Sequence, residues 1–194
     1  MKTCFRKPLF VVVFIAFSFL LLFGIFQKQI RSIFQEKNQT LGVEVLKDQG
    51  LPVRLKIPSI NVDAYVQHVG VTSEGDMEVP DNSDDVGWFK LGYRPGEVGS
   101  AVISGHFNGK NGEVGVFYDL VKLKKGDKLY LEDDNGTMTT FVVRESRVYD
   151  PGYAEEIFTL NDGAHLNLVT CDGVWDGIKK SYSKRLVVFT DITN

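Results

Sequence analysis

Three residues whose side chains can carry out acyl transfer lie at the ends of apolar stretches of this sequence. Cys171 ends the stretch LNLVTC, His106 follows AVISG, and Arg185 precedes LVVF. A thiolate can attack a carbonyl carbon, an imidazole can move the proton, and a guanidinium can hydrogen-bond the oxyanion that develops. These residue types predict thiol-dependent acyl transfer if the fold brings them together.

Cys171 is predicted to lie at the rim of the fold. Side chains alternate along a strand, so Cys171 points to the opposite face from Thr170. Asp172-Gly173 follows at once, which predicts that the strand ends at the thiol. A thiol at a strand end suits a nucleophile, whereas a buried cysteine serves only as a small apolar side chain.

His106 is the candidate proton partner among the three histidines. It follows a glycine where a predicted strand meets a loop, whereas His68 lies in an apolar stretch typical of a hydrogen-bonded structural histidine. His165 precedes Cys171 by six residues on one predicted strand, roughly 20 Å at about 3.3 Å per residue, which excludes direct contact. Arg185 is either a solvated charge at a strand end or a cation for the oxyanion, and its sequence context does not decide between them.

The elements that would position these residues follow an apolar N-terminal segment. Residues 9–26 are 18 uncharged residues, close to the roughly 20 that span a bilayer, and they predict an uncleaved single-pass anchor. A slight excess of basic residues before it predicts a cytoplasmic 1–8 and an extracellular remainder. Residues 27–50 predict a polar stalk, and residues 51–194 a folded catalytic domain. Cys4 precedes the anchor, so the exported part cannot form an internal disulfide.

Charge is distributed unevenly along the chain. The net charge is -3, yet residues 38–194 carry 16 Lys or Arg and 24 Asp or Glu, a net charge of -8. An acidic domain without a basic cluster is unsuited to bind a phosphate backbone. We therefore exclude nucleic acid as a partner.

The domain is predicted to be all-β. Helix is expected only at 114–120 and 154–160, and the sequence Asp-Asp-Asn-Gly at 133–136 predicts a hairpin turn. Short β-branched stretches separated by Gly, Asn, Asp and Pro predict strands. These are 53–57, 62–66, 101–104, 128–132, 140–149, 166–171 and 185–191. Seven or eight short strands with little helix predict a closed barrel or a sandwich.

The order of AVISGH, GVFYDL, LVTCDG and RLVV resembles the sortase family, the membrane-anchored cysteine transpeptidases of Gram-positive bacterial surfaces. LKIPSINVDAYV is similar to the family's opening strands, and VGWFKLGYRPGEVGSAVISGH to its approach to the histidine. The resemblance implies a closed eight-stranded β-barrel. It further implies that Cys171 is the nucleophile, His106 the general acid and base, Arg185 the stabiliser of substrate and oxyanion, and Thr170 an assistant to the oxyanion.

The resemblance also implies the reaction and its partners. The substrates are surface proteins with a signal like Leu-Pro-x-Thr-Gly, cleaved between Thr and Gly through a thioacyl intermediate and joined to an amine of peptidoglycan or lipid II, with no cofactor. Nearby cations are expected to favour the thiolate. The sequence most resembles class F or a related housekeeping-type group. The stalk lacks an Asp-Pro-Trp lid motif, which argues against pilin polymerisation.

Two other interpretations remain open at this point: a hydrolytic cysteine protease of another fold, and a non-enzymatic anchored β-domain in which Cys171 is buried. Calcium is left open but not favoured, because a solvated loop explains the acidic cluster and it lacks an Asp-x-Asp-x-Asn-Gly pattern. This acidic cluster consists of Glu74, Asp76, Glu78, Asp81, Asp84 and Asp85. Zinc is less favoured still, since the exported part has one cysteine and scattered histidines.

Overall fold

The computed structural model describes residues 49–109, 112–152 and 155–193. Residues 1–8, the predicted anchor 9–26, Cys4, and the predicted stalk up to residue 48 lie outside the described residues. Within the described part of the chain, no helix has the length and apolar character needed to cross a bilayer.

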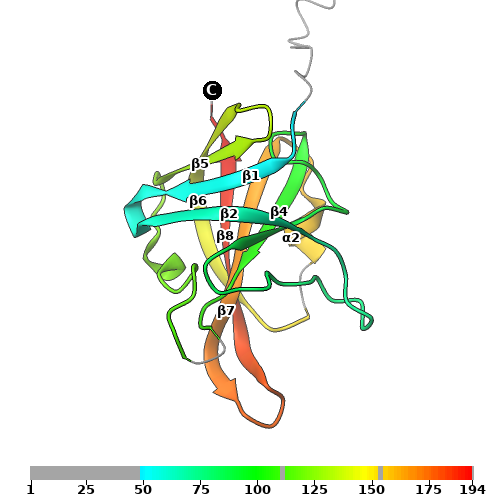
Figure 1. The fold of residues 1–194 in the computed structure, drawn as a ribbon, viewed down its shortest axis with the longest axis vertical. Helices are drawn as coiled ribbons and strands as arrows, with labels where there is room; N and C mark the ends of the chain where they lie inside the picture. Colours follow the sequence, from blue (N-terminus) through cyan, green and yellow to red (C-terminus); the bar gives the residue numbers. More distant parts are fainter. Residues whose placement is uncertain (1–48, 110–111, 153–154, 194) are drawn as a thin grey trace, which may run out of the picture. The chain divides into compact units, whose positions relative to one another are not determined.

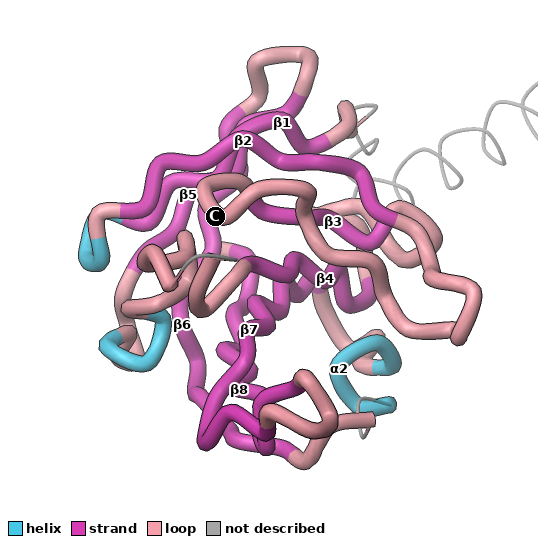
Figure 2. Tube along the Cα trace, turned by 60° about the horizontal axis from the view of Figure 1, so that its bottom comes forward, coloured by secondary structure: helices cyan, strands magenta, loops and turns pink. Residues whose placement is uncertain are grey.

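Eight strands close into a barrel, which confirms the predicted all-β fold (Figure 1). The strands are β1 (Pro52–Ile57), β2 (Val62–Val69), β3 (Val86–Phe89), β4 (Gly99–Gly105), β5 (Lys128–Asp133), β6 (Met138–Tyr149), β7 (Ala164–Asp176) and β8 (Ser181–Ile192). Their order around the barrel is β1-β2-β3-β4-β7-β8-β6-β5, with β5 pairing back to β1. Short helices η1 (Pro58–Ile60), η2 (Leu120–Lys122) and α2 (Glu155–Thr159) complete the fold, and Figure 2 shows α2 outside the barrel wall.

Strand alternation divides the apolar residues between two faces of the barrel wall. Leu166 and Leu168 of β7 fill the interior with Leu186 of β8, all 5% exposed or less. Val187 points the other way, into a smaller cluster with Ile157 of α2. Burying one such side chain contributes roughly 1.5–3 kcal/mol, so these two clusters fix which face of β7 and β8 points outward.

The structure corrects several predicted boundaries. All seven predicted strands are present, but β3 was missed because VGWF is short and contains a glycine. β7 continues to Asp176 rather than ending at the thiol, and β8 begins at Ser181, four residues before Arg185. The left-handed backbone of Gly173, with φ of 82°, accommodates a bulge, so the Asp-Gly pair interrupts the pairing without ending the strand.

The two predicted helices have different outcomes. Segment 154–160 contains the helix α2, as expected. Segment 114–120 is not a helix. It forms turns that lead into η2, and its glycine, Gly115, lies so close to the backbone of residues 106–107 that an added Cβ would be 2.2 Å from the His106 carbonyl oxygen.

Candidate active site

Cys171 and Arg185 lie directly opposite each other on neighbouring antiparallel strands. β7 and β8 pair over most of their length, and the pairs include Thr170 with Leu186 and Cys171 with Arg185. Residues directly opposite in a sheet share a face, so the thiol and the guanidinium side chains extend from the same side of the hairpin. Figure 1 shows this hairpin projecting past the barrel at the bottom of the view.

Cys171 lies where the hairpin leaves the barrel. Thr170 and Leu186, one step nearer the core, are buried, whereas Asp172 is half-buried and Gly173 exposed. Cys171 itself is half-buried and carries a free thiol. The rim position predicted from the sequence is therefore correct, although the strand continues beyond it.

His106 follows the last residue of β4, on the other side of β7. β4 and β7 are parallel, and their register runs from Gly99 opposite Ala164 to Ser104 opposite Val169. Thr170 Oγ1 donates to the carbonyl oxygen of Gly105, so the residue before Cys171 contacts the residue before His106. Cys171 and Arg185 therefore lie on the adjacent strands β7 and β8, and His106 directly follows β4, the neighbour of β7 on its other side.

The backbone of His106 is fixed by the segment that follows the loop. Phe117 N–H donates to the His106 carbonyl oxygen at 2.9 Å. The Phe117 ring is fully buried against Gly105, where an added Cβ would lie only 2.5 Å from the ring. This close approach is the physical reason for a glycine directly before the histidine.

The Thr170 side chain forms a hydrogen bond with the backbone of β4. Its hydroxyl donates to the Gly105 carbonyl oxygen at 2.8 Å, and the residue is 4% exposed. It points to the barrel interior, away from the face that carries Cys171. In this arrangement Thr170 joins the end of β4, just before His106, to the strand that carries the thiol.

The guanidinium of Arg185 donates hydrogen bonds to residues of its own hairpin. Its Nη1 donates to the carbonyl oxygens of Tyr182 and Lys184, and its Nη2 donates to Ser181 Oγ at 3.1 Å. Five donors in a planar fork allow a guanidinium to hold such contacts and still exert its charge on a neighbour.

Burial raises the pKa of the Cys171 thiol, and the charge of Arg185 offsets this effect only in part. Removing a thiolate from water is unfavourable, which explains the direction of the larger effect. The expectation that a nearby cation favours the thiolate holds for Arg185, whose charge lowers the thiol pKa, but burial has the larger effect.

A cavity of about 370 Å³ opens at the thiol. Its walls combine aromatic, apolar and charged side chains from β7, β8, the residue after His106, the segment before η2, and η2 itself. They are Phe107, Phe117, Tyr118, Asp119, Val121, Lys122, Thr170, Cys171, Asp172 and Leu186. Cys171 is thus accessible from a concave surface, which distinguishes it from a cysteine sealed in a core.

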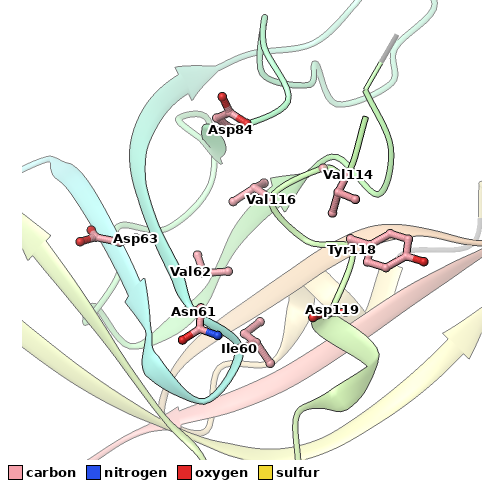
Figure 3. Close-up of a pocket in the computed structure, with 10 residues that line it drawn as sticks. Ile60, Asn61, Val62, Asp63, Asp84, Val114, Val116, Tyr118 and Asp119 are labelled. Carbon is pink, nitrogen blue, oxygen red and sulfur yellow. The ribbon is translucent and has the colours of Figure 1, made fainter. Parts of the chain in front are cut away.

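A second hollow of about 270 Å³ adjoins this cavity and shares Tyr118 and Asp119 with it (Figure 3). It lies between the beginning of β2 and the 114–119 segment, with Asp84 of the acidic cluster at its edge. Neither a histidine nor a cysteine lines it, so we assign it no chemistry.

The other two histidines have structural partners. His68 Nε2 lies 2.9 Å from the Pro52 carbonyl oxygen, as expected for a hydrogen-bonded structural histidine. His165 lies at the far end of β7 and bonds Asp162 and Asp191, both at 2.8 Å.

The acidic cluster is partly used in local hydrogen bonds. Glu78 accepts from Gly70 N–H, and Asp85 accepts from the amides of Gln67 and Asn82. Over the described ranges, no three His, Cys, Asp or Glu side chains are grouped so as to hold a metal ion.

Comparison with known proteins identifies the family. A model of the sortase domain matches residues 55–193. No curated protein gives a significant match. Among solved structures, sortase C from Clostridium perfringens SM101 is 26% identical with a TM-score of 0.56, and the match covers 75% of this chain and 72% of that one.

Two further structures share the fold at lower identity. Sortase C-1 from Actinomyces oris is 24% identical with a TM-score of 0.60, and the match covers 80% of this chain and 81% of that one. Sortase A from Corynebacterium diphtheriae is 19% identical with a TM-score of 0.59, covering 76% and 62%. The domain match extends over well over half of the sequence, and the closed barrel agrees with it: this chain belongs to the sortase family.

Proposed function

We propose that this sortase is a cysteine transpeptidase that cleaves a signal like Leu-Pro-x-Thr-Gly between Thr and Gly and joins the surface protein to a cell-wall amine. The observation that carries the proposal is the pairing of Cys171 with Arg185 across β7 and β8, beside a cavity that opens at the thiol. His106, at the end of the strand on the other side of β7, completes the set.

The first half-reaction forms a thioester. Cys171 Sγ, as the thiolate, attacks the Thr carbonyl carbon, and Arg185 stabilises the charge on the carbonyl oxygen. The C–N bond to Gly breaks, and His106 donates a proton to the departing amine. The acyl group of the surface protein is then held on Cys171.

The second half-reaction regenerates the thiol. An amine of peptidoglycan or lipid II attacks the thioester carbonyl, His106 accepts its proton, and Cys171 departs as thiolate. Water in place of the amine gives hydrolysis, the outcome of a protease. The ratio of amine transfer to hydrolysis therefore separates the two activities.

The apolar part of the signal is assigned to the outer face of β7. Val169 shares this face with Cys171, two residues away, and packs, as Phe89 and Phe158 do, against the buried cluster that includes Ile157 of α2. We place the Leu and Pro of the signal along this face, because apolar side chains gain most from an apolar surface.

The remaining assignments are proposals of the same kind. Residues 9–26 anchor the chain in the cell membrane with the catalytic domain outside. The reaction uses no cofactor, because a thiol, an imidazole and a guanidinium together supply the nucleophile, the proton carrier and the oxyanion partner. The relationship to class F, or to a housekeeping-type group, stays a prediction, since structural likeness at 19–26% identity does not separate classes.

The test is a cleavage assay on the full chain in detergent, with quenched sorting-motif peptides and a panel of amine acceptors. We expect cleavage with amine-dependent product in the wild type, and its loss in Cys171→Ala, His106→Ala and Arg185→Ala. Cleavage that persists in Cys171→Ala would refute the nucleophile. Cleavage without any amine adduct would support the hydrolytic alternative.

A further inference from the structure

The ring of His106 bonds a backbone carbonyl rather than a side chain. Its Nε2 lies 2.9 Å from the Pro80 carbonyl oxygen. A carbonyl oxygen can accept a hydrogen bond but cannot donate one, so Nε2 carries the proton in this contact. The nitrogen left to accept or donate a proton during a reaction is then Nδ1.

Pro80 is held firmly although it belongs to an exposed loop. It is buried, unlike its neighbours Val79 and Asp81, and its ring packs against Gly87 of β3. A Cβ at Gly87 would lie 3.3 Å from Pro80 Cδ, so a side chain there would push the proline away. The carbonyl that receives the His106 bond therefore has a defined position.

Gln67 of β2 fixes the chain directly after Pro80. Its Oε1 accepts from Asp81 N–H at 3.1 Å, and its Nε2 donates to Asp85 Oδ2 at 2.9 Å. Asn82 donates to the same carboxylate at 2.7 Å and accepts from the N–H groups of Asp84 and Asp85. The end of the acidic cluster is thus an ordered turn anchored to the barrel.

The same turn is tied to the segment that fixes the His106 backbone. Val116 N–H donates to the Ser83 carbonyl oxygen at 2.8 Å, and the next residue, Phe117, donates to the His106 carbonyl oxygen at 2.9 Å. Asp84 and Val116 line the same hollow from its two sides (Figure 3). The same network of hydrogen bonds therefore holds both the backbone of His106 and the Pro80 carbonyl that accepts from its ring.

We propose that the Pro80 carbonyl is the positioning group of His106, and that Gln67 acts through it. The carbonyl keeps the neutral imidazole protonated on Nε2 and leaves Nδ1 to exchange the proton with the Cys171 thiol and the substrate amine. The Pro80 carbonyl thus orients the histidine, as an Asp or Asn side chain does in other sites that pair a nucleophile with a histidine. The proposal rests on the proposed function for the role of His106, but not for the hydrogen bond.

The direct test is nitrogen NMR of the full chain in nanodiscs with ¹⁵N-labelled histidine, with His106→Gln used to assign the signal. We expect neutral His106 to carry its proton on Nε2, with that proton protected from exchange with water. A proton on Nδ1, or an Nε2 proton that exchanges as fast as that of free imidazole, overturns the proposal. This readout needs no substrate, so it stands even if the proposed function fails.

The second test removes the support of the turn. We expect Gln67→Leu to lower kcat roughly tenfold with KM within twofold, to abolish protection of the Nε2 proton, and to leave Cys171 alkylation unchanged. Tyr65→Leu, an exposed change on the same strand, is the control and should match the wild type. Normal kcat and normal protection in Gln67→Leu would contradict the role of Gln67.

Discussion

At the scale of single residues, two opposing effects act on the pKa of the Cys171 thiol. Burial in the barrel wall favours the neutral thiol, and the guanidinium across the strand pair favours the thiolate. Burial is the larger effect, so the net shift of the thiol pKa is upward. Arg185 limits the rise in the thiol pKa, and in the proposed reaction it also stabilises the oxyanion.

Replacing Arg185 should separate these functions. Arg185→Ala removes the charge that offsets burial, so the Cys171 pKa rises further and iodoacetamide labels the thiol more slowly at neutral pH. Peptide cleavage should fall further than labelling, by about 10²–10³-fold, because the oxyanion also loses its partner. Arg185→Lys keeps the charge and should stay close to the wild type in labelling. Faster labelling of Arg185→Ala would contradict the electrostatic argument.

At the scale of elements, the end of β4 and the β7–β8 hairpin position the three predicted site residues. Thr170 joins β7 to the last residue of β4, and Gly173 permits the bulge just past the thiol. These are contacts between strands, so a change in one of them shifts one reactive residue relative to another. The exposed apices of such hairpins tolerate far more change.

Thr170→Val tests whether the threonine anchors β4 or assists the oxyanion. An anchoring role predicts a loss of about 1–3 kcal/mol in the free energy of unfolding, because the Gly105 carbonyl is buried and loses its donor. Thr170→Ser should retain most of the stability and activity. Urea denaturation and the cleavage assay measure both quantities. A large loss of kcat at unchanged stability would instead favour the oxyanion role.

Gly173→Ala tests the bulge in the hairpin. The backbone of Gly173 is left-handed, and an added Cβ would lie 2.4 Å from Ser183 Oγ. We expect weaker protection of hairpin amides from hydrogen exchange and reduced cleavage, while the melting temperature of the barrel changes little. Gly177→Ala is the matched control, since nothing lies within 4 Å of its added Cβ. Equal behaviour of the two variants would show that the bulge is not required.

At the scale of the whole molecule, a polar cluster joins β6, β7 and β8 near the beginning of β7, far from Cys171. Asp191 of β8 accepts from Arg144 of β6 at 2.7 Å and bonds His165 of β7 at 2.8 Å. His165 is buried at 5% exposure, and its second ring nitrogen bonds Asp162. This cluster links the three C-terminal strands of the barrel, far from the thiol.

Stability at acid pH should reveal this cluster. The hydrogen bond from His165 lowers the pKa of Asp162 below its ordinary value of 3.8. The stabilisation that this hydrogen bond gives to the ionised Asp162 is therefore present above pH 3.8. It is lost as the pH falls through the lower pKa of Asp162 in the folded state. Asp162→Asn should have a slightly lower melting temperature than the wild type at pH 6, and the difference should shrink as the pH is lowered below 3.8. A difference that does not shrink with falling pH would exclude ionisation of Asp162 as its cause, and Asp76→Asn serves as the control.

Much of the fold could be predicted from local sequence because strand alternation and turn chemistry act over a few residues. The Asp133–Gly136 turn is an example, with Gly136 in the left-handed region and Asp133 accepting from the N–H groups of Asn135 and Thr137. β3 could not be predicted because its identity depends on pairing with β2 and β4 rather than on its own four residues. The hairpin extension beyond Cys171 depends in the same way on pairing with β8.

The sequence by itself determined which reactive groups are available: a thiol, an imidazole and a guanidinium, in an order that resembles sortases. It also determined the face of β7 that carries Cys171, because alternation is a local property. Only the tertiary structure decided that Arg185 stands opposite Cys171, that burial outweighs its charge at the thiol, and that the Pro80 carbonyl receives the His106 ring. Register, burial and backbone acceptors depend on residues distant in sequence, and no local pattern encodes them.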